Sequence, residues 1–136
     1  MKNFIHHIVL TVTDSKKSAE FYEKILDWDV VEQKGTYAYL VPDGKKYPET
    51  EFMLVLGEVR DEKNPLAPFN RNNIGLDHFA FGVENLDELK EIEARLNRLG
   101  VTMENGGITD DDFGGTAIFC KDPDGMKVEF HCLKRG

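Results

Sequence analysis

The sequence predicts an α+β fold made of two similar βαβββ modules, because several short patterns occur twice along the chain. Residues 7–14 read HIVLTVTD and residues 78–85 read HFAFGVEN, so each is a β-rich run that opens with His and closes on a residue that favours a helix N-cap. The turn signal Pro-Asp-Gly occurs at 42–44 and again at 123–125. A repeat of this kind marks one supersecondary unit that is used twice.

Each repeated strand leads into an amphipathic helix. The first helix is expected to begin after Asp14. Its apolar stripe consists of Ala19, Phe21, Tyr22, Ile25 and Leu26. The second helix begins at Asn85, carries Asp87 and Glu88 in its first turn, where the helix dipole favours acidic groups, and ends at Gly100. One face of each helix is therefore expected to pack on a sheet, which leaves the helices outside.

Several strands are expected after each helix. The clearest of them lie at 36–41, 51–56, 116–120 and 126–133. A segment rich in Pro and Asn separates the two halves. The expected organisation is a single domain over residues 1–136, with module 1 at about 4–57, a connector at 58–74 and module 2 at about 75–134.

The composition excludes several classes of partner. The chain has 17 Lys and Arg against 25 Asp and Glu, a net charge of −8, and no basic stripe, so neither nucleic acid nor a membrane surface is expected to bind it. No run approaches the roughly 18 apolar residues of a membrane span, and the first residues lack the apolar stretch of a secretory signal, which predicts a cytoplasmic protein. The two cysteines, Cys120 and Cys132, are too few for a disulfide framework.

Strand parity predicts that four side chains with metal-binding chemistry share one surface. Side chains alternate between the faces of a strand, and the face without the larger apolar residues contains His7 in the first module and His78 in the second. Residues 50–54 align with 128–132, which makes Glu51 and Glu129 equivalent and turns both toward this face. The four side chains are therefore expected to line a shared, partly apolar cavity.

Two imidazoles and two carboxylates in such a cavity suit one divalent metal ion, for which Zn, Ni, Fe and Mn are all candidates. The ion would act as a Lewis acid toward a carbonyl or enediolate oxygen, and a carboxylate that leaves the metal would be a base for a nearby C–H proton. Taken singly, each of the four residues is as well explained as an ordinary polar strand residue. Their occurrence at equivalent places of the repeat favours the metal site.

Three motifs make the chain similar to a known superfamily. The run at 7–15 (HIVLTVTDS) with 18–22 (SAEFY), the run at 75–81 (GLDHFAF) and the run at 122–130 (DPDGMKVEF) resemble the vicinal oxygen chelate superfamily. That superfamily includes glyoxalase I, bleomycin and fosfomycin resistance proteins, and extradiol dioxygenases. The resemblance implies two βαβββ modules that form a U-shaped, largely antiparallel sheet around a central metal cavity, with a homodimer that shares or completes the site.

The resemblance also implies which residues bind the metal. The ligand positions of the superfamily correspond to His7, His78 and Glu129. With Glu51 as a fourth ligand the set looks like that of glyoxalase I, which isomerises the hemithioacetal of methylglyoxal and a thiol such as glutathione, with Glu129 or Glu51 as the base. An insertion around 45–50 leaves the register of Glu51 open. A shift of one residue would leave three ligands, as in iron oxygenases with two His and one carboxylate or in the thiol transferases of fosfomycin resistance.

Four further residues are candidates for substrate binding. Met53 and His131 share the strand faces of the two carboxylates. Phe113 lies beside the acidic run 110–112 between two Gly-Gly pairs, a segment that is either a lid over the substrate or a solvated loop. Arg71 could bind a substrate carboxylate through the fork of its guanidinium.

These inferences lead to one preferred function and two alternatives. The preferred function is metal-dependent isomerisation of a thiol hemithioacetal through an enediolate, as in a lactoylglutathione lyase. The first alternative is ring cleavage of a catechol-type substrate by an Fe(II)-dependent extradiol dioxygenase. The second is a metal-free module that sequesters a cationic drug, as bleomycin-resistance relatives do, to which an acidic protein is suited. The expected partners are a small-molecule substrate and a second copy of the chain.

Overall fold

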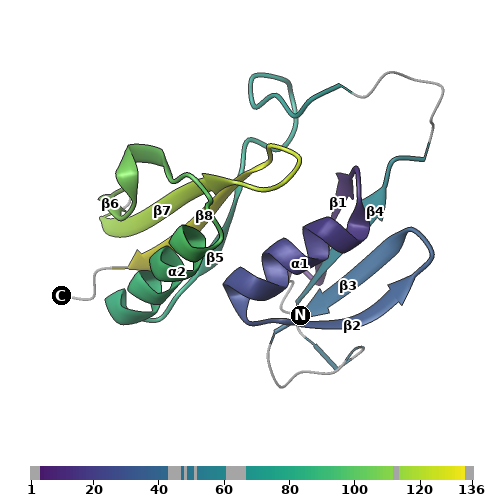
Figure 1. The fold of residues 1–136 in the computed structure, drawn as a ribbon, viewed down its shortest axis with the longest axis horizontal. Helices are drawn as coiled ribbons and strands as arrows, with labels where there is room; N and C mark the ends of the chain where they lie inside the picture. The colour runs from purple at the N-terminus through teal and green to yellow at the C-terminus, as the bar shows by residue number, and fades with distance from the viewer. Residues whose placement is uncertain are drawn as a thin grey trace. The chain divides into compact units, whose positions relative to one another are not determined.

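The computed structural model describes residues 4–42, 47, 49–50, 52–60, 67–111 and 114–133. The chain divides into two compact units, Met1–Ala67 and Pro68–Gly136. As Figure 1 shows, each unit packs one α-helix against one four-stranded sheet. The predicted α+β class and the repeated βαβββ order are therefore confirmed.

The first unit has the order strand, helix and three strands. Its elements are β1 (His7–Val12), α1 (Ser15–Leu26), β2 (Asp29–Lys34), β3 (Tyr37–Val41) and β4 (Met53–Glu58). The strand order in its sheet is β1-β4-β3-β2. β1 runs parallel to β4, whereas β3 is antiparallel to both β4 and β2.

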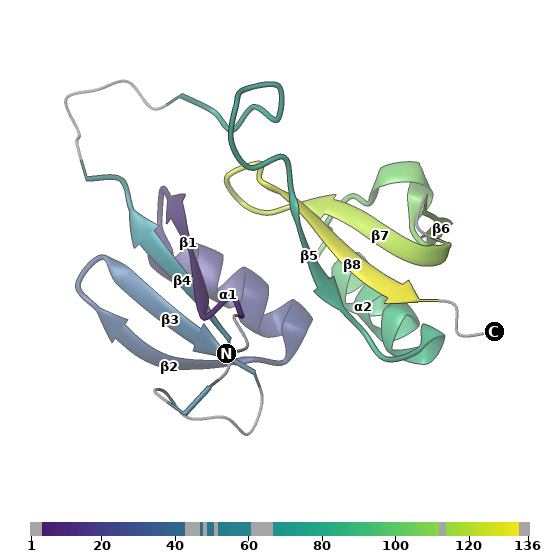
Figure 2. The same ribbon diagram turned by 180° about the vertical axis from the view of Figure 1, so that it is seen from behind.

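The second unit repeats this order and adds one 3-10 turn after its helix. Its elements are β5 (Phe79–Gly82), α2 (Leu86–Arg98), the turn η1 (Glu104–Gly106), β6 (Thr109–Asp110), β7 (Gly115–Lys121) and β8 (Lys127–Leu133). The strand order β5-β8-β7-β6, with β5 parallel to β8, matches the topology of the first sheet (Figure 2). β2 and β6 gave no clear sequence signal, because β2 is polar and mostly exposed and β6 has only two residues.

Both helices begin and end where the sequence indicates. The side chains of Asp14 and Asn85 each accept a hydrogen bond from the backbone N–H three residues later, at 3.0 and 2.9 Å. Asp27 follows α1 with φ of 57°, and Gly100 stands at the end of α2 with φ of 69°. The left-handed position that ends a helix is thus taken by Asp in the first unit and by the more usual Gly in the second. Neither α-helix of the described residues has the length and apolar character needed to span a bilayer.

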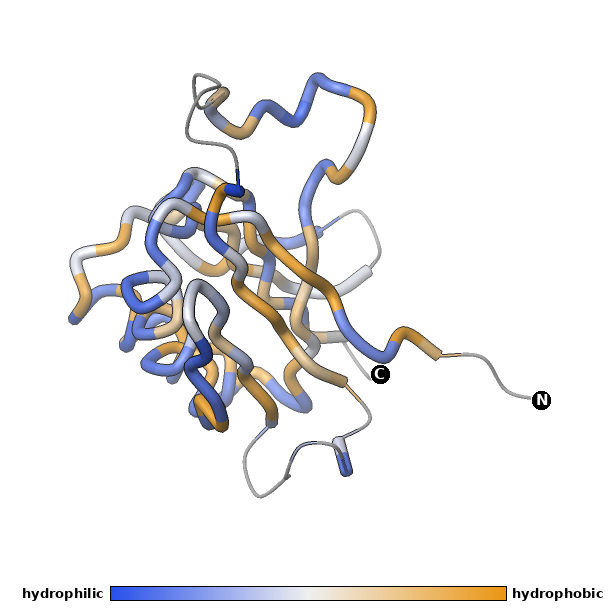
Figure 3. Tube along the Cα trace, turned by 90° about the vertical axis from the view of Figure 1, so that its right-hand side faces the viewer, coloured by the Kyte–Doolittle hydropathy of each residue, from blue (hydrophilic) through white to orange (hydrophobic). Residues whose placement is uncertain are grey.

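The core of each unit lies between its helix and its sheet. α1 contacts β2, β3 and β4, and α2 contacts β7 and β8. The fully buried side chains include Tyr22, Ile25, Leu40, Leu54 and Leu56 in the first unit and Leu89, Leu96, Ile118, Val128 and Phe130 in the second. Figure 3 shows long hydrophobic stretches along the strands and alternating hydropathy along the helices. Along β1, His7, Val9 and Thr11 are exposed while Leu10 and Val12 are buried, which confirms the predicted strand parity.

Candidate functional site

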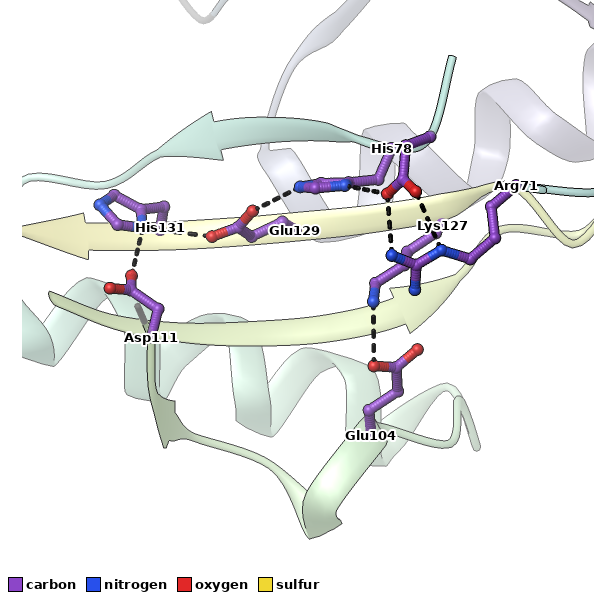
Figure 4. Close-up of polar contacts among 8 residues, drawn as sticks. Arg71, His78, Glu104, Asp111, Lys127, Glu129 and His131 are labelled. Carbon is purple, nitrogen blue, oxygen red and sulfur yellow. Dashed lines mark hydrogen bonds and ion pairs between the residues drawn. The ribbon is translucent and has the colours of Figure 1, made fainter. Parts of the chain in front are cut away.

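A row of polar side chains lies on the face of the second sheet that is turned away from the buried core (Figure 4). The row consists of Arg71, Asp77, His78, Glu129, His131 and Asp111. His78 directly precedes β5 and Glu129 lies in the middle of β8, and Nε2 of His78 is 3.0 Å from Oε2 of Glu129. The strand register places Ala80 beside Glu129, so a small neighbour leaves room for the carboxylate. Only 7% of the Glu129 side chain is exposed, and a carboxylate this deeply buried needs a partner on each oxygen.

The residue before His78 holds its ring in place. Nδ1 of His78 lies 2.6 Å from Oδ1 of Asp77, and Nε and Nη2 of Arg71 contact the same carboxylate at 3.0 and 3.1 Å. The hydrogen bond from His78 lowers the pKa of Asp77, desolvation opposes this, and the guanidinium of Arg71 lowers the pKa further. Asp77 is therefore a carboxylate that accepts a hydrogen bond from the Nδ1–H of His78, and Nε2 is the nitrogen turned toward Glu129.

The second oxygen of Glu129 is held in a similar way. Nδ1 of His131 lies 3.2 Å from Oε1 of Glu129 and 2.7 Å from Oδ2 of Asp111. Asp111, Glu129 and His131 together place three possible metal donors within 4.8 Å of one another. Glu129 thus has an imidazole on each side, His78 at Oε2 and His131 at Oε1. Each imidazole also contacts an aspartate, Asp77 and Asp111 respectively.

One lysine lies in the same part of the second sheet but is paired with another acid. Nζ of Lys127 is 3.3 Å from Oε2 of Glu104 and 4.6 Å from the centre of the Phe119 ring. The Phe119 ring also meets the ring of His78 edge-on, with 6.2 Å between the ring centres. The ammonium charge is therefore directed to Glu104, and Phe119 packs beside the imidazole that faces Glu129.

The first unit presents His7 at the place equivalent to His78. His7 opens β1 with its side chain exposed, and its Nδ1 lies 2.9 Å from Nδ1 of His6. A hydrogen bond between two Nδ1 atoms needs one donor and one acceptor, so His6 influences which nitrogen of His7 carries a proton. His7 thus has an imidazole as its neighbour, where His78 has a carboxylate.

The strand registers identify a different counterpart for Glu129 than the sequence alignment does. Val9 lies beside Val55 in the first sheet, and Ala80 lies beside Glu129 in the second. Since Val9 and Ala80 occupy the same place in the repeat, Val55 is the structural counterpart of Glu129. The alignment of Glu51 with Glu129 is corrected accordingly, because the shared Glu-Phe letters precede β4 in the first module but lie inside β8 in the second. Glu51 itself lies outside the described residues.

Two of the substrate-binding candidates take part in the polar row. The guanidinium fork of Arg71 is bidentate on Asp77, so it acts on a protein carboxylate. The ring of His131 contacts Glu129. Both side chains therefore contact carboxylates of the polar row. Phe113 lies outside the described residues.

Met53, another candidate, belongs to an apolar and aromatic cluster on the first sheet. The cluster consists of Val41, Met53, Val55, Tyr37 and Tyr39. Gly57 allows the ring of Tyr37 to approach β4, because a Cβ at Gly57 would stand 2.7 Å from that ring. Arg60 donates from Nη2 to the Tyr37 hydroxyl at 2.6 Å. This cluster has the chemistry to contact the apolar part of a small molecule.

The sequence pattern did not reveal the roles of Asp77 and Asp111. Strand parity turns adjacent side chains apart, but Asp77 and His78 precede β5, where that rule does not hold. Asp111 falls in an acidic run that is typical of a solvated loop or lid, whereas its side chain is only 4% exposed. The one signal in the sequence is that Asp77 directly precedes His78; Asp111 lies after β6, while His131 lies on β8, which is not part of the same hairpin.

The polar row fits a divalent transition metal. Imidazole nitrogen and carboxylate oxygen are the donors that Zn, Ni, Fe and Mn accept. Nε2 of His78 and Oε2 of Glu129 face each other, and hydrogen bonds to their remaining polar atoms fix both groups. The row contains Asp77, Asp111 and Glu129 against the single guanidinium of Arg71. With neutral imidazoles, a divalent cation would balance this excess of negative charge.

Known relatives with different activities are about equally similar to this chain. It is 31% identical over 127 residues to the metallothiol transferase FosB of Staphylococcus saprophyticus, covering 93% of this chain and 75% of that protein. It is 30% identical over 129 residues to the lactoylglutathione lyase of Escherichia coli, covering 90% and 87%. It is also 30% identical over 129 residues to the catechol-2,3-dioxygenase of Bacillus subtilis, covering 93% of this chain but only 40% of that protein.

A family model and a solved structure agree on the fold. A glyoxylase/bleomycin resistance protein/dioxygenase domain from Frankia sp. EAN1pec matches with a TM-score of 0.79 and 26% identity, over 100% of this chain and 95% of that chain. The model of the glyoxalase/bleomycin resistance protein/dioxygenase superfamily matches residues 4–130. The chain therefore belongs to the glyoxalase/bleomycin resistance protein/dioxygenase superfamily.

Proposed function

We propose that this protein is a divalent-metal-dependent enzyme in which His7, His78 and Glu129 hold the ion. The observation that carries the proposal is the approach of Nε2 of His78 to Oε2 of Glu129 at 3.0 Å, on a carboxylate that is 7% exposed. His7 is the third donor because it occupies the repeat position equivalent to His78 and is exposed on the face of its own sheet opposite Leu10 and Val12.

Three protein donors leave coordination positions for a small-molecule substrate. When bound, the ion supplies Lewis-acid chemistry toward a substrate oxygen. Asp77 keeps Nε2 of His78 turned toward the ion. The first unit has the apolar Val55 at the position equivalent to Glu129, so this position provides no fourth donor. The aromatic cluster around Met53 is proposed to contact the apolar part of the substrate.

The proposed reaction is transfer of a low-molecular-weight thiol to a small electrophile such as the epoxide fosfomycin. A C–S bond forms, the C–O bond of the electrophile breaks, and the thiol proton ends on the released oxygen. A set of two His and one Glu resembles that of the thiol transferases of fosfomycin resistance. The similarity to a metallothiol transferase supports this assignment.

Hemithioacetal isomerisation is the second candidate, supported by the similarity to a lactoylglutathione lyase. It would recruit Glu51 as a fourth ligand or as the base alongside Glu129. Extradiol ring cleavage is the third candidate, supported by the similarity to a catechol-2,3-dioxygenase, and it would require Fe(II) and oxygen. Glu51 and the metal identity therefore separate the three reactions.

Metal analysis of the full chain tests the proposed ligand set. We expect about one divalent ion per chain in the wild type and almost none in His78→Ala or Glu129→Gln. Glu51→Gln should retain the ion, like the matched control Glu49→Gln two residues earlier. If Glu51→Gln lost the ion while Glu49→Gln kept it, hemithioacetal isomerisation would become the preferred reaction instead of thiol transfer. A wild-type protein that binds no ion after anaerobic reconstitution would overturn the enzyme proposal in favour of drug binding.

Activity assays on the reconstituted protein test the reaction. Protein loaded with Mn, Zn, Ni or Fe should consume fosfomycin together with a thiol such as cysteine or bacillithiol, and Glu129→Gln should abolish this activity. Turnover of methylglyoxal hemithioacetal or of catechol in place of fosfomycin would contradict the assignment. Light scattering of the same preparation tests the proposed homodimer, which should show twice the mass of one chain.

A further inference from the structure

Oε1 of Glu129, the oxygen that does not face His78, is contacted by His131, which in turn contacts Asp111. Nδ1 of His131 lies 3.2 Å from this oxygen and 2.7 Å from Oδ2 of Asp111, as Figure 4 shows. The exposed fractions of the side chains are 7% for Glu129, 19% for His131 and 4% for Asp111. Water therefore has little access to replace these contacts, and the orientation of the Glu129 carboxylate depends on them.

Asp111 is itself fixed by the hairpin that joins β6 to β7. Its backbone N–H donates to the carbonyl of Gly115 at 3.1 Å, and its Oδ1 accepts from the Gly115 N–H at 2.9 Å. A Cβ at Gly115 would stand 2.5 Å from the backbone oxygen of Cys132 and 3.1 Å from both Oδ2 of Asp111 and Cε1 of His131. Glycine at 115 thus leaves room first for the β8 backbone and then for the side chains of Asp111 and His131.

We propose that Asp111 and His131 are a positioning pair for Glu129. By holding Oε1, the pair presents Oε2 alone to the side of His78, so Glu129 binds the ion through one oxygen in a fixed direction. A carboxylate without this restraint can rotate and bind through both oxygens or turn away. This inference rests on the proposed function, in which Glu129 is a metal ligand, and it assigns neither Asp111 nor His131 to the ion.

The atoms involved allow a rescue experiment. The contacts of His131 are made by Nδ1, which the amide nitrogen of an asparagine at 131 would approximate, with one N–H for Asp111 and one for Glu129. Alanine at 131 removes the donor. Asp111→Asn keeps Oδ1 for the Gly115 N–H but turns an amide N–H toward Nδ1 of His131, so the histidine can no longer donate from Nδ1 to Glu129.

The test is a Co²⁺ titration of the metal-free full chain, followed by visible absorption, which reports affinity and ligand geometry together. We expect His131→Ala and Asp111→Asn to weaken Co²⁺ binding by about 10-fold to 100-fold and to change the spectrum. His131→Asn should recover affinity to within about threefold of the wild type. Asp110→Asn, one residue away on β6, is the matched control and should bind as the wild type does. Thermal unfolding of each metal-free variant controls for loss of the fold.

The outcomes separate this inference from the proposed function. Wild-type affinity and spectrum in His131→Ala would overturn the positioning role, while metal binding itself stood. Failure of His131→Asn to recover binding would also overturn it, because donation from the Nδ1 position would then not be the cause. If the wild type binds no Co²⁺, the proposed function fails first. If Asp110→Asn weakens binding as much as Asp111→Asn, the effect belongs to the hairpin as a whole and the pair has no specific role.

Discussion

The two sheets share one topology, but the faces turned away from their cores carry different chemistry. In the second sheet, Glu129 on β8 lies beside Phe119 on β7, and in the first sheet Val55 on β4 lies beside Tyr39 on β3. An aromatic ring is therefore present at both places, while the carboxylate is present only in the second unit. The repeat has preserved the aromatic packing partner and not the carboxylate.

The neighbouring positions show an exchange of large and small side chains. His131 lies beside Ala117 in the second sheet, and the equivalent pair in the first sheet is Gly57 beside Tyr37. Each pair contains one large and one small residue, on opposite strands. The space above the sheet is thus filled in both units, by an imidazole in one and by a phenol ring in the other. This face can diverge because the fold depends on the opposite face.

The largest effect is expected where the two units are most alike, in their cores. Ile25 on α1 and Leu96 on α2 are both fully buried at equivalent helix positions. Truncation of either to alanine should lower the free energy of unfolding by about 2–5 kcal/mol, because each leaves a cavity between helix and sheet. Urea unfolding followed by circular dichroism measures this. Leu86→Ala, at a residue 44% exposed, is the control and should change stability by about 0.5 kcal/mol or less. A small effect in one unit only would show that the cores are not equivalent.

The second prediction places the missing carboxylate in the first unit. Val55 is 4% exposed, so Val55→Glu should cost about 3 kcal/mol of stability at neutral pH through burial of a charge. Burial raises the pKa of the new carboxyl above its unfolded value, so the loss should shrink as the pH falls toward 5. Urea unfolding at two pH values, with and without Zn²⁺, measures both effects.

Val55→Gln is the matched control, because it has the same shape without the charge. It should show neither the pH dependence nor recovery of stability by Zn²⁺, whereas a fourth metal donor in Val55→Glu should give such recovery. Equal behaviour of the two variants would mean that position 55 is not the counterpart of Glu129.

The core and the proximity of His78 to Glu129 were predictable from sequence, because both depend on local periodicity. The alternation around Leu10 and Phe81 identifies the buried faces, and strand parity then brings His78 and Glu129 together. The counterpart of Glu129 was not predictable, because an insertion in the loop before β4 shifts the sequence alignment relative to the strand register. Residues that match in sequence therefore do not occupy equivalent positions in β4 and β8. Strand register is a long-range property that hydrogen bonding between β1 and β4 decides.

The aspartates behind the histidines were not predictable for a related reason. Asp111 reaches His131 through a hairpin whose geometry depends on Gly115. The sequence shows that acidic run only as a polar segment between glycines. A contact between two residues twenty apart in the chain follows from the pairing of β7 with both β6 and β8, which no local pattern encodes.

The third prediction compares the supports of the two proposed histidine ligands. His78 donates to the carboxylate of Asp77, whereas His7 contacts the imidazole of His6. Asp77→Asn keeps an acceptor oxygen but removes the charge, so Co²⁺ affinity should fall by about tenfold. His6→Asn should change it by about threefold or less, because an exposed imidazole contributes less to ligand basicity than a carboxylate does. The Co²⁺ titration measures both, and a larger effect for His6→Asn would reverse the assigned roles.

The smallest effect concerns a buried thiol, a group that the first core lacks. Cys120 lies at the position that Leu40 occupies in the first unit, beside Val128 and Leu54 respectively. Burial, with smaller contributions from Asp122 and Glu104, raises the pKa of the Cys120 thiol from 9.0 to about 12. Because the folded pKa is the higher one, the unfolded chain loses this proton first, and the contribution to stability is lost as the pH rises through 9 to 12. Between pH 8 and 9.5, deprotonation of Cys120 in the unfolded chain should lower the free energy of unfolding by about 0.8 kcal/mol.

Urea unfolding at these two pH values measures the effect. The difference in stability between them should be smaller in Cys120→Ala than in the wild type. An equal pH dependence in the two proteins would mean that the thiol is as readily ionised in the folded chain as in the unfolded one, and would contradict the burial of Cys120.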